Sequence, residues 1–486
     1  MRERADTFLF LFTKILTGFI GLLSITLQTK YLIPSEVGQF SLINGVVSAL
    51  VSVLIGWIGS SALRYYYSYS KDKQKEYFST ILIDWIVMVV ASGAVLVLVA
   101  FVSSDLPIKN FLAFSLIFLL FSSLMEITEK MMRASKRTKI YCALLIIESA
   151  INVGFILLLH SVITSGVNLL LLLKITTCSI FGITSIVVLH FFRYFKPKSF
   201  SWSLNKIFFK YGFPMVGIWG IGWLLSYSDR YIINNYLSAT EVGLYDVAYV
   251  FSERTMGVVV LSFGLAFFPM MIRVWKSKGK EETIETLKES ISYYLLLSIP
   301  MVVGISFLSY YFYGTILDLS YRDAYLVMPI TCIGFLISGI NNFLYKLWQL
   351  EEKTWKVLLV TTIAVVINIA LNIIFIPIYG YIVAAITTTV SYLVASIITL
   401  IWVYIKFHIK IDWTKISQIL MGCFGMCAFL NFATNYINGI LSLIVIIIVA
   451  AAIYFLTLLL NGGLSNDIVL LKRWINGRKT NSKKRD

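Results

Sequence analysis

Long runs of apolar residues, separated by short polar segments, recur from one end of the chain to the other. The runs reach the roughly 20 residues that an α-helix needs to cross the hydrocarbon core of a membrane. We therefore predict an all-α polytopic membrane protein with about 14 transmembrane helices. These spans are expected near residues 8–31, 37–63, 77–102, 108–132, 140–160, 167–192, 209–236, 242–272, 286–313, 324–349, 355–377, 381–405, 416–436 and 438–461.

Ten residues recur in nearly the same form in both halves of the chain. Residues 31–40 read YLIPSEVGQF and residues 236–245 read YLSATEVGLY, an offset of 205 residues. In each copy a long apolar run ends at the Tyr-Leu pair, a short turn follows, and a second apolar run begins just after the Glu. Two similar hairpins half a chain apart indicate an internally duplicated transporter.

The spacing of the spans predicts two six-helix lobes followed by an additional helix pair. With six spans each, the lobes have the same orientation and are parallel repeats related by an axis along the membrane normal. A substrate path is then expected between them. The expected divisions are an N-terminal lobe at 1–195, a C-terminal lobe at 205–407, the helix pair at 413–462 and a basic cytoplasmic tail at 463–486.

The composition supports a membrane protein. The chain has 486 residues, of which 58% are hydrophobic and 14% are charged, and its mean hydropathy is +0.84. Soluble proteins carry about 25% charged residues. The five cysteines lie in apolar runs without the spacing of metal ligands, so they are expected to pack within helices. No cofactor is predicted.

The charge distribution predicts the orientation. Lysine and arginine outnumber aspartate and glutamate by 41 to 25. If the N-terminus is cytoplasmic, the inner segments hold most of these cations, whereas the outer loops hold only Lys30, Lys109 and Arg322. Cytoplasmic loops retain positive charge, so both termini are predicted to be cytoplasmic. The basic tail is expected to lie on anionic lipid rather than on nucleic acid.

Several short motifs resemble those of polysaccharide flippases in the multidrug/oligosaccharidyl-lipid/polysaccharide (MOP) superfamily. They are YLIPSEVGQF at 31–40, RY at 64–65, YGFP at 211–214, SDR at 228–230, EVGLY at 241–245, AY at 248–249, FP at 268–269, PIYGY at 377–381 and AA at 384–385. The resemblance extends from the first span to the twelfth and agrees in span count and orientation. It does not identify a particular sugar.

The resemblance implies a two-lobed transporter with a cationic central cavity that opens alternately to either side. It implies transport of an undecaprenyl-diphosphate-linked oligosaccharide, such as an O-antigen or other surface polysaccharide repeat unit, to the outer leaflet of a bacterial cytoplasmic membrane. A polysaccharide polymerase and chain-length machinery are the implied protein partners. A multidrug exporter and a lipid II flippase are the alternatives. Many such exporters have an acidic residue in the first span, where this chain has Lys14.

Charged residues inside the spans are site candidates, because a charge in the hydrocarbon core is costly unless it serves a site or a buried pair. A small, polar face of the first span consists of Lys14, Thr17, Gly18, Gly21, Ser24 and Gln28. This face is predicted to line a cavity in which Lys14 and Gln28 contact the substrate. Alternatively, Lys14 reaches the headgroups at the cytoplasmic surface.

The seventh span carries a second candidate face. Trp219, Trp223, Arg230 and Asn234 recur there at helical spacing. Aromatic rings can stack on sugars and an arginine fork binds phosphate, so these four residues are predicted to bind a glycolipid head group. In the alternative interpretation the tryptophans pack between helices, and the adjacent Asp229 or a facing carboxylate neutralises Arg230.

The eighth span carries Asp246, Glu253 and Arg254. The resemblance implies that Arg254 contacts the diphosphate. Arg64, at the inner end of the second span, is expected to receive the diphosphate on entry or to anchor that helix at the interface. Asp229, Asp246 and Glu253 are predicted to serve ion coupling or gating, although structural ion pairs are the alternative.

Other polar groups in the spans are interpreted as structural, because a polar group away from lipid needs a partner within the bundle. The expected pairs and hydrogen-bonding residues are Lys174 with Glu148, Glu126 with Lys130, and Asn368 and Asn372 in the eleventh span. Sugar contact is the alternative role for the two asparagines.

The sequence favours a transporter over an enzyme. It contains no nucleotide-binding loop, zinc motif, nucleophile elbow or pair of catalytic carboxylates. A membrane polymerase or ligase would need a sizeable outer loop for its active site, and none is predicted. A purely structural role in a wall-synthesis complex is a further alternative, which a transport assay would distinguish.

Overall fold

The computed structural model describes residues 2–69, 73–103, 106–135, 137–407 and 412–463. In this part of the chain, 14 helical segments are long and apolar enough to cross a membrane. The predicted all-α polytopic fold is confirmed. The basic tail expected at 463–486 lies, after Gly463, outside the described residues.

The first half of the chain supplies six of these segments. Its second span consists of α2, a π-helical turn (η1) and α3, which the sequence predicted as one uninterrupted helix. The elements are α1 (Arg2–Tyr31), α2 (Pro34–Leu50), η1 (Val51–Ile55), α3 (Gly56–Tyr65), α4 (Gln74–Val102), α5 (Leu112–Ala134), α6 (Thr138–Leu159), α7 (Gly166–Val188) and the short α8 (Phe191–Tyr194).

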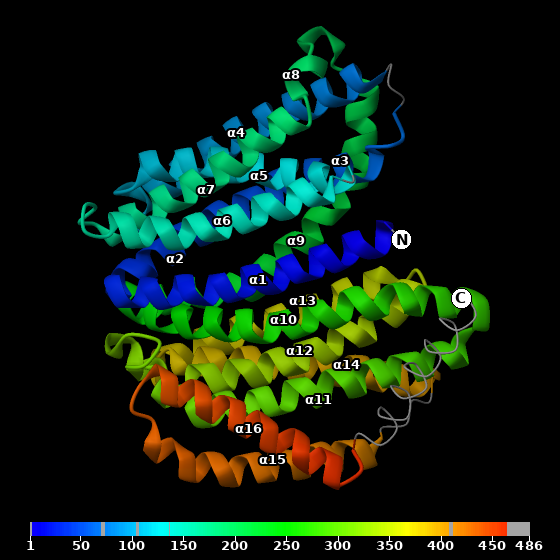
Figure 1. Ribbon diagram of the computed structural model, residues 1–486. Helices are drawn as coiled ribbons and strands as arrows, with labels where there is room; N and C mark the ends of the chain where they lie inside the picture. Colours follow the sequence, from blue (N-terminus) through cyan, green and yellow to red (C-terminus); the bar gives the residue numbers. More distant parts are fainter. Residues whose placement is uncertain (1, 70–72, 104–105, 136, 408–411, 464–486) are drawn as a thin grey trace, which may run out of the picture.

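The second half supplies eight segments. The elements are α9 (Trp202–Tyr236), α10 (Ala239–Lys278), α11 (Lys280–Phe312), α12 (Val327–Leu350), α13 (Thr354–Tyr379), α14 (Ile382–Phe407), α15 (Trp413–Ala433) and α16 (Ile440–Leu460). The last two helices form a pair against α11 at the edge of the molecule (Figure 1).

The sixth span is shorter than predicted. The sequence placed its end near residue 192, but α7 ends at Val188. His190 then adopts a left-handed conformation, with φ of 56°. A non-glycine residue in this region interrupts a right-handed helix. The chain therefore turns at His190 before α8 begins at Phe191.

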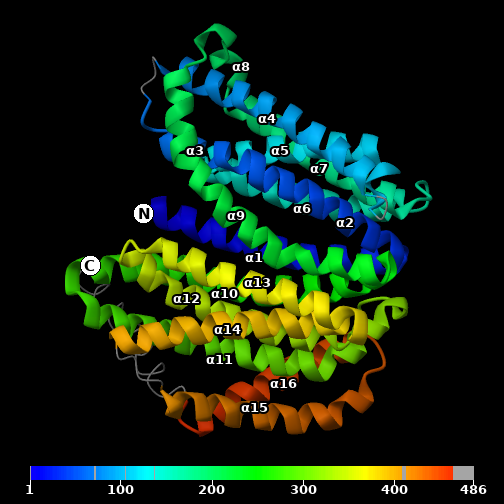
Figure 2. The same ribbon diagram turned by 180° about the vertical axis from the view of Figure 1, so that it is seen from behind.

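The helices form two lobes, with α1 to α7 in one and α10 to α14 in the other (Figures 1 and 2). Helix α9 connects them. Its first half packs on α3, where Ser61 Oγ donates to the Phe208 carbonyl oxygen at 2.8 Å. Its second half packs on α13, where Ser228 Oγ donates to Asn368 Oδ1 at 3.4 Å. Helix α9 thus begins against the first lobe and ends within the second.

The two copies of the duplicated motif pack against each other, at the junction of α2 and α10. We call this end of the molecule, where α1 ends and α2 begins, the outer end, in keeping with the predicted orientation. A second contact joins the two halves of the chain at the outer end. The Tyr321 hydroxyl, from a 3₁₀ turn at Leu319–Ala324 (η5), donates to the Leu32 carbonyl oxygen at 2.9 Å. The lobes are therefore joined at the outer end by loops and helix ends from both halves.

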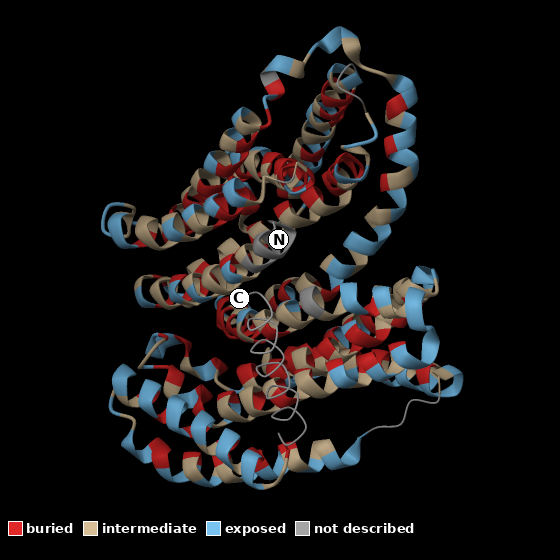
Figure 3. Cartoon of the chain, turned by 45° about the vertical axis from the view of Figure 1, so that its right-hand side comes forward, coloured by how far each residue is buried: buried red, intermediate tan, exposed pale blue. Residues whose placement is uncertain are grey.

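Buried positions follow the helix faces inside each lobe, and exposed positions lie on the outside (Figure 3). Many of the exposed side chains are large and apolar, as on α4 and α16, where Leu98 and Leu441 are examples. In water such a surface would be unfavourable, whereas in a membrane it faces lipid at no cost.

Candidate functional site

A cavity of about 310 Å³ lies where α1, α6 and α10 meet. The cavity lies between the two lobes, because α1 and α6 belong to the first lobe and α10 to the second. Its lining residues are Lys14, Thr17, Gly18, Leu145, Glu148, Ser149, Arg254, Gly257, Val258 and Leu261. Two of the predicted substrate-binding cations, Lys14 and Arg254, are thus brought to one cavity. We refer to it as the cationic cavity.

Lys14 lies well inside α1. Because the helix begins at Arg2, Lys14 is about 18 Å from that end of the helix at 1.5 Å per residue. Its ammonium is 5.6 Å from the centroid of the Phe10 ring. Within the described residues no carboxylate lies within 4.0 Å of this ammonium. Lys14 thus lines the cavity without an ion-pair partner among the described residues.

Arg254 is exposed although it lies 15 residues into α10, about 22 Å from the outer start of that helix. Its guanidinium rests against α1 at Gly21. A Cβ atom on Gly21 would lie 1.8 Å from Arg254 Nη1, so a larger residue at position 21 would displace the guanidinium from this place. No ion pair joins Arg254 to a carboxylate in the described part of the chain. Its charge is therefore available to a ligand.

Glu148 of α6 also lines the cationic cavity. Lys174, Lys14 and Arg254 are the cations whose charges act on it. The expected partner, Lys174, does not come within ion-pair distance among the described residues. From the sequence we predict Glu148 in a structural pair rather than in the site, although a single carboxylate in an otherwise apolar helix is a signal for a site residue.

Arg230 lies elsewhere, buried in the second lobe at 2% exposure. Its Nε is 2.6 Å from Asp246 Oδ1, and its Nη1 is 3.3 Å from Asp229 Oδ1. The rings of Tyr227 and Tyr249 lie 4.8 and 4.6 Å from the guanidinium carbon. The guanidinium is thus already paired and enclosed by aromatic rings. This geometry matches the alternative interpretation, because both the adjacent Asp229 and the facing Asp246 neutralise Arg230.

The three carboxylates predicted to serve coupling or gating have different surroundings. Asp229 is fully buried, accepts from the Tyr245 hydroxyl and pairs with Arg230. Asp246 also pairs with Arg230. Glu253 is exposed beside Arg254, and no ion pair involves it in the described ranges. Among the three, Glu253 alone is exposed at the level of the cavity.

The two tryptophans of α9 are in different environments. Trp223 Nε1 donates to the Gly45 carbonyl oxygen at 3.0 Å, and its ring stacks on Tyr227. This is a packing role against α2. Trp219 is 47% exposed, and the Lys130 ammonium lies 5.2 Å from its ring centroid. Its free surface can still contact a ligand.

The other predicted site residues lie away from the cationic cavity. Gln28 Nε2 donates to Ser24 Oγ at 3.3 Å near the outer end of α1. Asn234 is half-buried near the outer end of α9. Arg64 is exposed at the inner end of α3, with its guanidinium carbon 5.8 Å from the Tyr211 ring centroid. None of the three lines this cavity.

The second lobe contains a buried network of amide and hydroxyl groups. Asn368 Nδ2 donates to Thr388 Oγ1 at 3.0 Å, and Asn372 Nδ2 donates to Asn368 Oδ1 at 3.3 Å. The Thr387 hydroxyl donates to Asn372. These bonds join α13 to α14, as expected for polar groups shielded from lipid.

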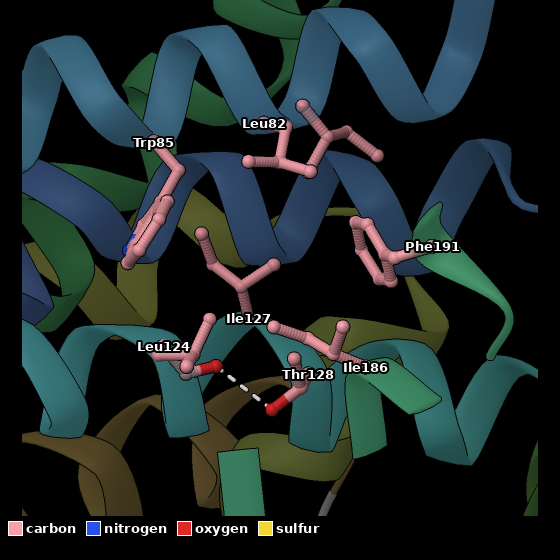
Figure 4. A pocket seen from close by; sticks show the side chains of 8 residues that line it. Leu82, Trp85, Leu124, Ile127, Thr128, Ile186 and Phe191 are labelled. Atoms are coloured by element: carbon pink, nitrogen blue, oxygen red, sulfur yellow. Dashed lines mark hydrogen bonds between the residues drawn. The ribbon is translucent and has the colours of Figure 1, made fainter. Parts of the chain in front are cut away.

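A small void in the first lobe is apolar (Figure 4). It measures about 30 Å³, and its lining is almost entirely hydrocarbon and aromatic. The hydroxyl of Thr128 is already satisfied, because it donates to the Leu124 carbonyl oxygen at 2.8 Å. An apolar space of this size is a packing defect rather than a binding site.

The chemistry available in the cationic cavity is anion binding. Ammonium and guanidinium groups form charge-assisted hydrogen bonds with phosphate oxygens, and a guanidinium can bind two oxygens at once. Among the described residues there is no cluster of three His, Cys, Asp or Glu side chains that could hold a metal ion. The cavity is suited to an anionic ligand that enters between the lobes.

Two solved structures share the fold of this protein. It superposes on lipid II flippase MurJ in its inward closed conformation with a TM-score of 0.72 and 15% identity, covering 96% of this chain and 99% of that chain. A multidrug resistance MATE family transporter of the MOP superfamily, in an inward-facing conformation, superposes with a TM-score of 0.64 and 12% identity, over 79% of this chain and 93% of that chain. This is the fold of the MOP-superfamily transporters. Residues 4–275 match the family described as polysaccharide biosynthesis protein, and the chain belongs to that family.

Two curated proteins match this chain by sequence. One is the probable low-salt glycan biosynthesis flippase Agl15 of Haloferax volcanii, 27% identical over 206 residues, which are 41% of this chain and 43% of that protein. The other is an uncharacterized membrane protein of Methanocaldococcus jannaschii, 26% identical over 284 residues, 57% of this chain and 54% of that protein. The matches span about half the length of each relative. The named relatives are flippases or transporters, in agreement with the prediction of a protein that is not an enzyme.

Proposed function

We propose that this protein is a flippase that moves an undecaprenyl-diphosphate-linked oligosaccharide from the cytoplasmic to the outer leaflet by alternating access. The oligosaccharide would be a repeat unit of a surface polysaccharide, such as an O-antigen. Family membership and the similarity to a glycan biosynthesis flippase support the substrate class. The proposed location is a bacterial cytoplasmic membrane, with both termini cytoplasmic and a polymerase and chain-length machinery as partners.

The cationic cavity is the observation that carries this proposal. Lys14 and Arg254 face it from different lobes, and neither forms an ion pair within the described residues. A diphosphate that crosses hydrocarbon without partners would pay a very large desolvation cost. Two cations at mid-depth lower that cost. Glu148 reduces their mutual repulsion while the cavity is empty.

The contacts between the lobes support alternating access. In the structure they meet at the outer end, through the duplicated motif and the Tyr321 hydroxyl. The head group would enter from the inner side, bind Lys14 and Arg254, and leave after the outer contacts open. The polyprenyl chain would remain in lipid beside the lobes. Because the two cations come from different lobes, binding of one diphosphate links the lobes together.

The test is transport in reconstituted vesicles and in cells. Cells that lack the protein are expected to accumulate a complete lipid-linked repeat unit and to lose the corresponding surface polymer. That lipid, extracted and placed in proteoliposomes with purified protein, should become accessible on the opposite leaflet to a membrane-impermeant glycosidase. The double variant Lys14→Ala with Arg254→Ala should lose this transport.

The matched control is Lys109→Ala, because Lys109 is a cation on an outer loop, over the Phe101 ring. It should transport at the wild-type rate. If the double variant also transports at that rate, the proposed mechanism is wrong. If the lipid-linked pool does not change in cells that lack the protein, the proposed substrate is wrong.

Export of a cationic drug is a second candidate function. The observation that favours it is the pair of carboxylates at this level, Glu148 in the cavity and Glu253 exposed beside Arg254. New sensitivity of the deletion strain to cationic drugs, with an unchanged lipid-linked pool, would support export over flipping. A lipid II flippase is distinguished by which lipid accumulates.

A further inference from the structure

We infer that Trp219, Glu126 and Lys130 form a carbohydrate subsite that binds the oligosaccharide while its diphosphate occupies the cationic cavity. The inference rests on the proposed function, since it concerns the sugar of the same substrate. It assigns the two chemical parts of the head group to two different places. We call these three residues the tryptophan subsite.

Lys130 is the fixed centre of the tryptophan subsite. It is a charged residue of α5 with only 7% exposure. Its ammonium lies 2.5 Å from Glu126 Oε1 and donates to the Gly56 carbonyl oxygen at 3.3 Å and to Ser60 Oγ at 3.4 Å. All these partners lie at or near the junction of η1 and α3 or on the preceding turn of α5. Lys130 is therefore held in place and its charge is neutralised.

Glycine provides the space for this lysine. A Cβ atom on Gly59 would lie 2.8 Å from Lys130 Cδ. The ammonium lies 3.3 Å from the carbonyl oxygen of Gly56, the residue directly after the π-helical turn η1. A π-helical turn disturbs the usual helix hydrogen bonding and is frequent at functional sites. The irregular second span thus supplies both the space and an acceptor for Lys130.

Trp219 covers Lys130 from the other side. Its ring centroid is 5.2 Å from the Lys130 ammonium. The tryptophan is nevertheless 47% exposed, and the Glu126 side chain is 29% exposed. An aromatic ring and a carboxylate are therefore both accessible in one place. This combination suits a sugar, whose apolar face stacks on a ring while its hydroxyl groups donate to a carboxylate.

The repeat places this subsite at the depth of the cationic cavity. Lys14 and Trp219 each precede the first residue of a motif copy, Tyr31 and Tyr236, by 17 residues. At 1.5 Å per residue both lie about 26 Å from the outer end of their helices. Helix α1 lies toward the viewer in Figure 1 and helix α9 in Figure 2, so the cationic cavity and the tryptophan subsite are built on different helices.

The cationic cavity and the tryptophan subsite differ in net charge. The cationic cavity has two cations without ion-pair partners in the described residues, which favours a diphosphate. In the tryptophan subsite Glu126 balances Lys130, so the pair has no net charge to attract an anion. A neutral, hydroxyl-rich group is the better ligand for it. A head group bound across both places has its phosphates toward α1 and its sugar toward α9.

The experiment compares two ligands on the purified full-length protein. The probes are bare undecaprenyl diphosphate and the lipid-linked saccharide extracted from cells that lack the protein. Trp219→Ala should weaken binding of the saccharide-bearing lipid by about tenfold, roughly the energy of one good aromatic contact. Binding of the bare lipid should not change, which also shows that the variant is folded. Trp219→Phe should restore most of the loss.

Glu126→Gln provides a second test, because it keeps the shape of the side chain but removes the charge that the sugar hydroxyl groups would meet. It should also weaken only the saccharide-bearing lipid. Trp202→Ala is the control, since Trp202 is an exposed tryptophan at the start of the same helix. It should change neither affinity.

The outcomes separate the inference from the proposed function. If Trp219→Ala weakens both lipids equally, or neither, the tryptophan subsite is refuted while the flippase can stand. If the wild-type protein binds the bare lipid as tightly as the saccharide-bearing one, the subsite is also refuted. If the wild-type protein binds neither lipid, the proposed function itself fails.

Discussion

Gly38 and Gly243 occupy the same position in the two copies of the duplicated motif, and in the folded protein they lie backbone to backbone. A Cβ atom on Gly38 would be 1.8 Å from the Ala239 carbonyl oxygen, and one on Gly243 would be 1.8 Å from the Pro34 carbonyl oxygen. Pro34 and Ala239 are themselves equivalent positions of the repeat. The contact is therefore reciprocal between the two copies of the motif at the outer end.

Gly38→Ala should open the outer end, because a side chain there collides with a backbone atom that cannot rotate away. A single cysteine at Thr17, in a variant that lacks the five native cysteines, reports on the opening. Labelling of that cysteine by an impermeant maleimide from outside should increase several-fold. Gly243→Ala should act in the same direction.

The control for this pair is Gly154→Ala, since nothing lies within 4 Å of a Cβ atom built on that helical glycine. Labelling should then stay at the wild-type level. Equal labelling in Gly38→Ala and in this control would show that the glycine contact does not hold the outer end closed.

Gly21→Ala should impair substrate binding without disrupting the fold. The added methyl group would meet Arg254 Nη1, the end of a flexible side chain, so the guanidinium can move while the helices remain packed. We expect about tenfold weaker binding of undecaprenyl diphosphate, close to the effect of losing one charge-assisted hydrogen bond. Gly304→Ala, on α11, is the matched helical control and should bind normally. An unchanged affinity in Gly21→Ala would mean that the position of Arg254 does not matter for the phosphate.

Arg230→Ala should destabilise the protein rather than remove a substrate contact. It would leave the buried Asp229 and the partly buried Asp246 without their cation, and breaking such a pair costs about 3–5 kcal/mol. Thermal unfolding in detergent should show a much lower midpoint than for Arg254→Ala, because Arg254 is an exposed residue that forms no ion pair among the described residues. A stable Arg230→Ala protein that fails to bind the diphosphate would reverse these two assignments.

Tyr321→Phe should weaken the outer closure modestly. It removes one hydrogen bond to the Leu32 carbonyl oxygen, worth about 1 kcal/mol. Burial raises the pKa of the Tyr321 hydroxyl, and the nearby Glu36 and Asp318 add to this effect. The neutral donor is lost only as pH rises through this raised pKa, so the contact should persist across the neutral range. The labelling assay should show a smaller increase than for Gly38→Ala, with no change between pH 6 and pH 8 from this residue.

The apolar pattern alone predicted the class of the fold and nearly all helix positions. Spans of about 20 apolar residues have few alternatives to a transmembrane helix, because the backbone must satisfy its own hydrogen bonds in lipid. The sequence did not predict the π-helical turn at Val51–Ile55 or the break at His190. Both are local departures from helical geometry that the apolar pattern does not encode.

The sequence also supplied the list of charged residues within the spans, since any charge in an apolar helix is conspicuous. The sequence could not show which of these charges line a cavity and which are paired. Lys14 and Arg254 line one cavity, whereas Arg230 is enclosed by Asp229 and Asp246, yet all three had the same signal in the sequence. Whether a cation is free or paired depends on residues of other helices.

By itself, then, the sequence determined the helical membrane fold, the duplication and the set of candidate charges, because each depends on local composition or on comparison of one segment with another. Only the tertiary structure decided that the two copies of the motif meet at Gly38 and Gly243, and that Glu148 joins Lys14 and Arg254. These relationships depend on how helices from different lobes pack. The spacing of residues along one helix fixes which of them share a face, but not which helix that face will meet.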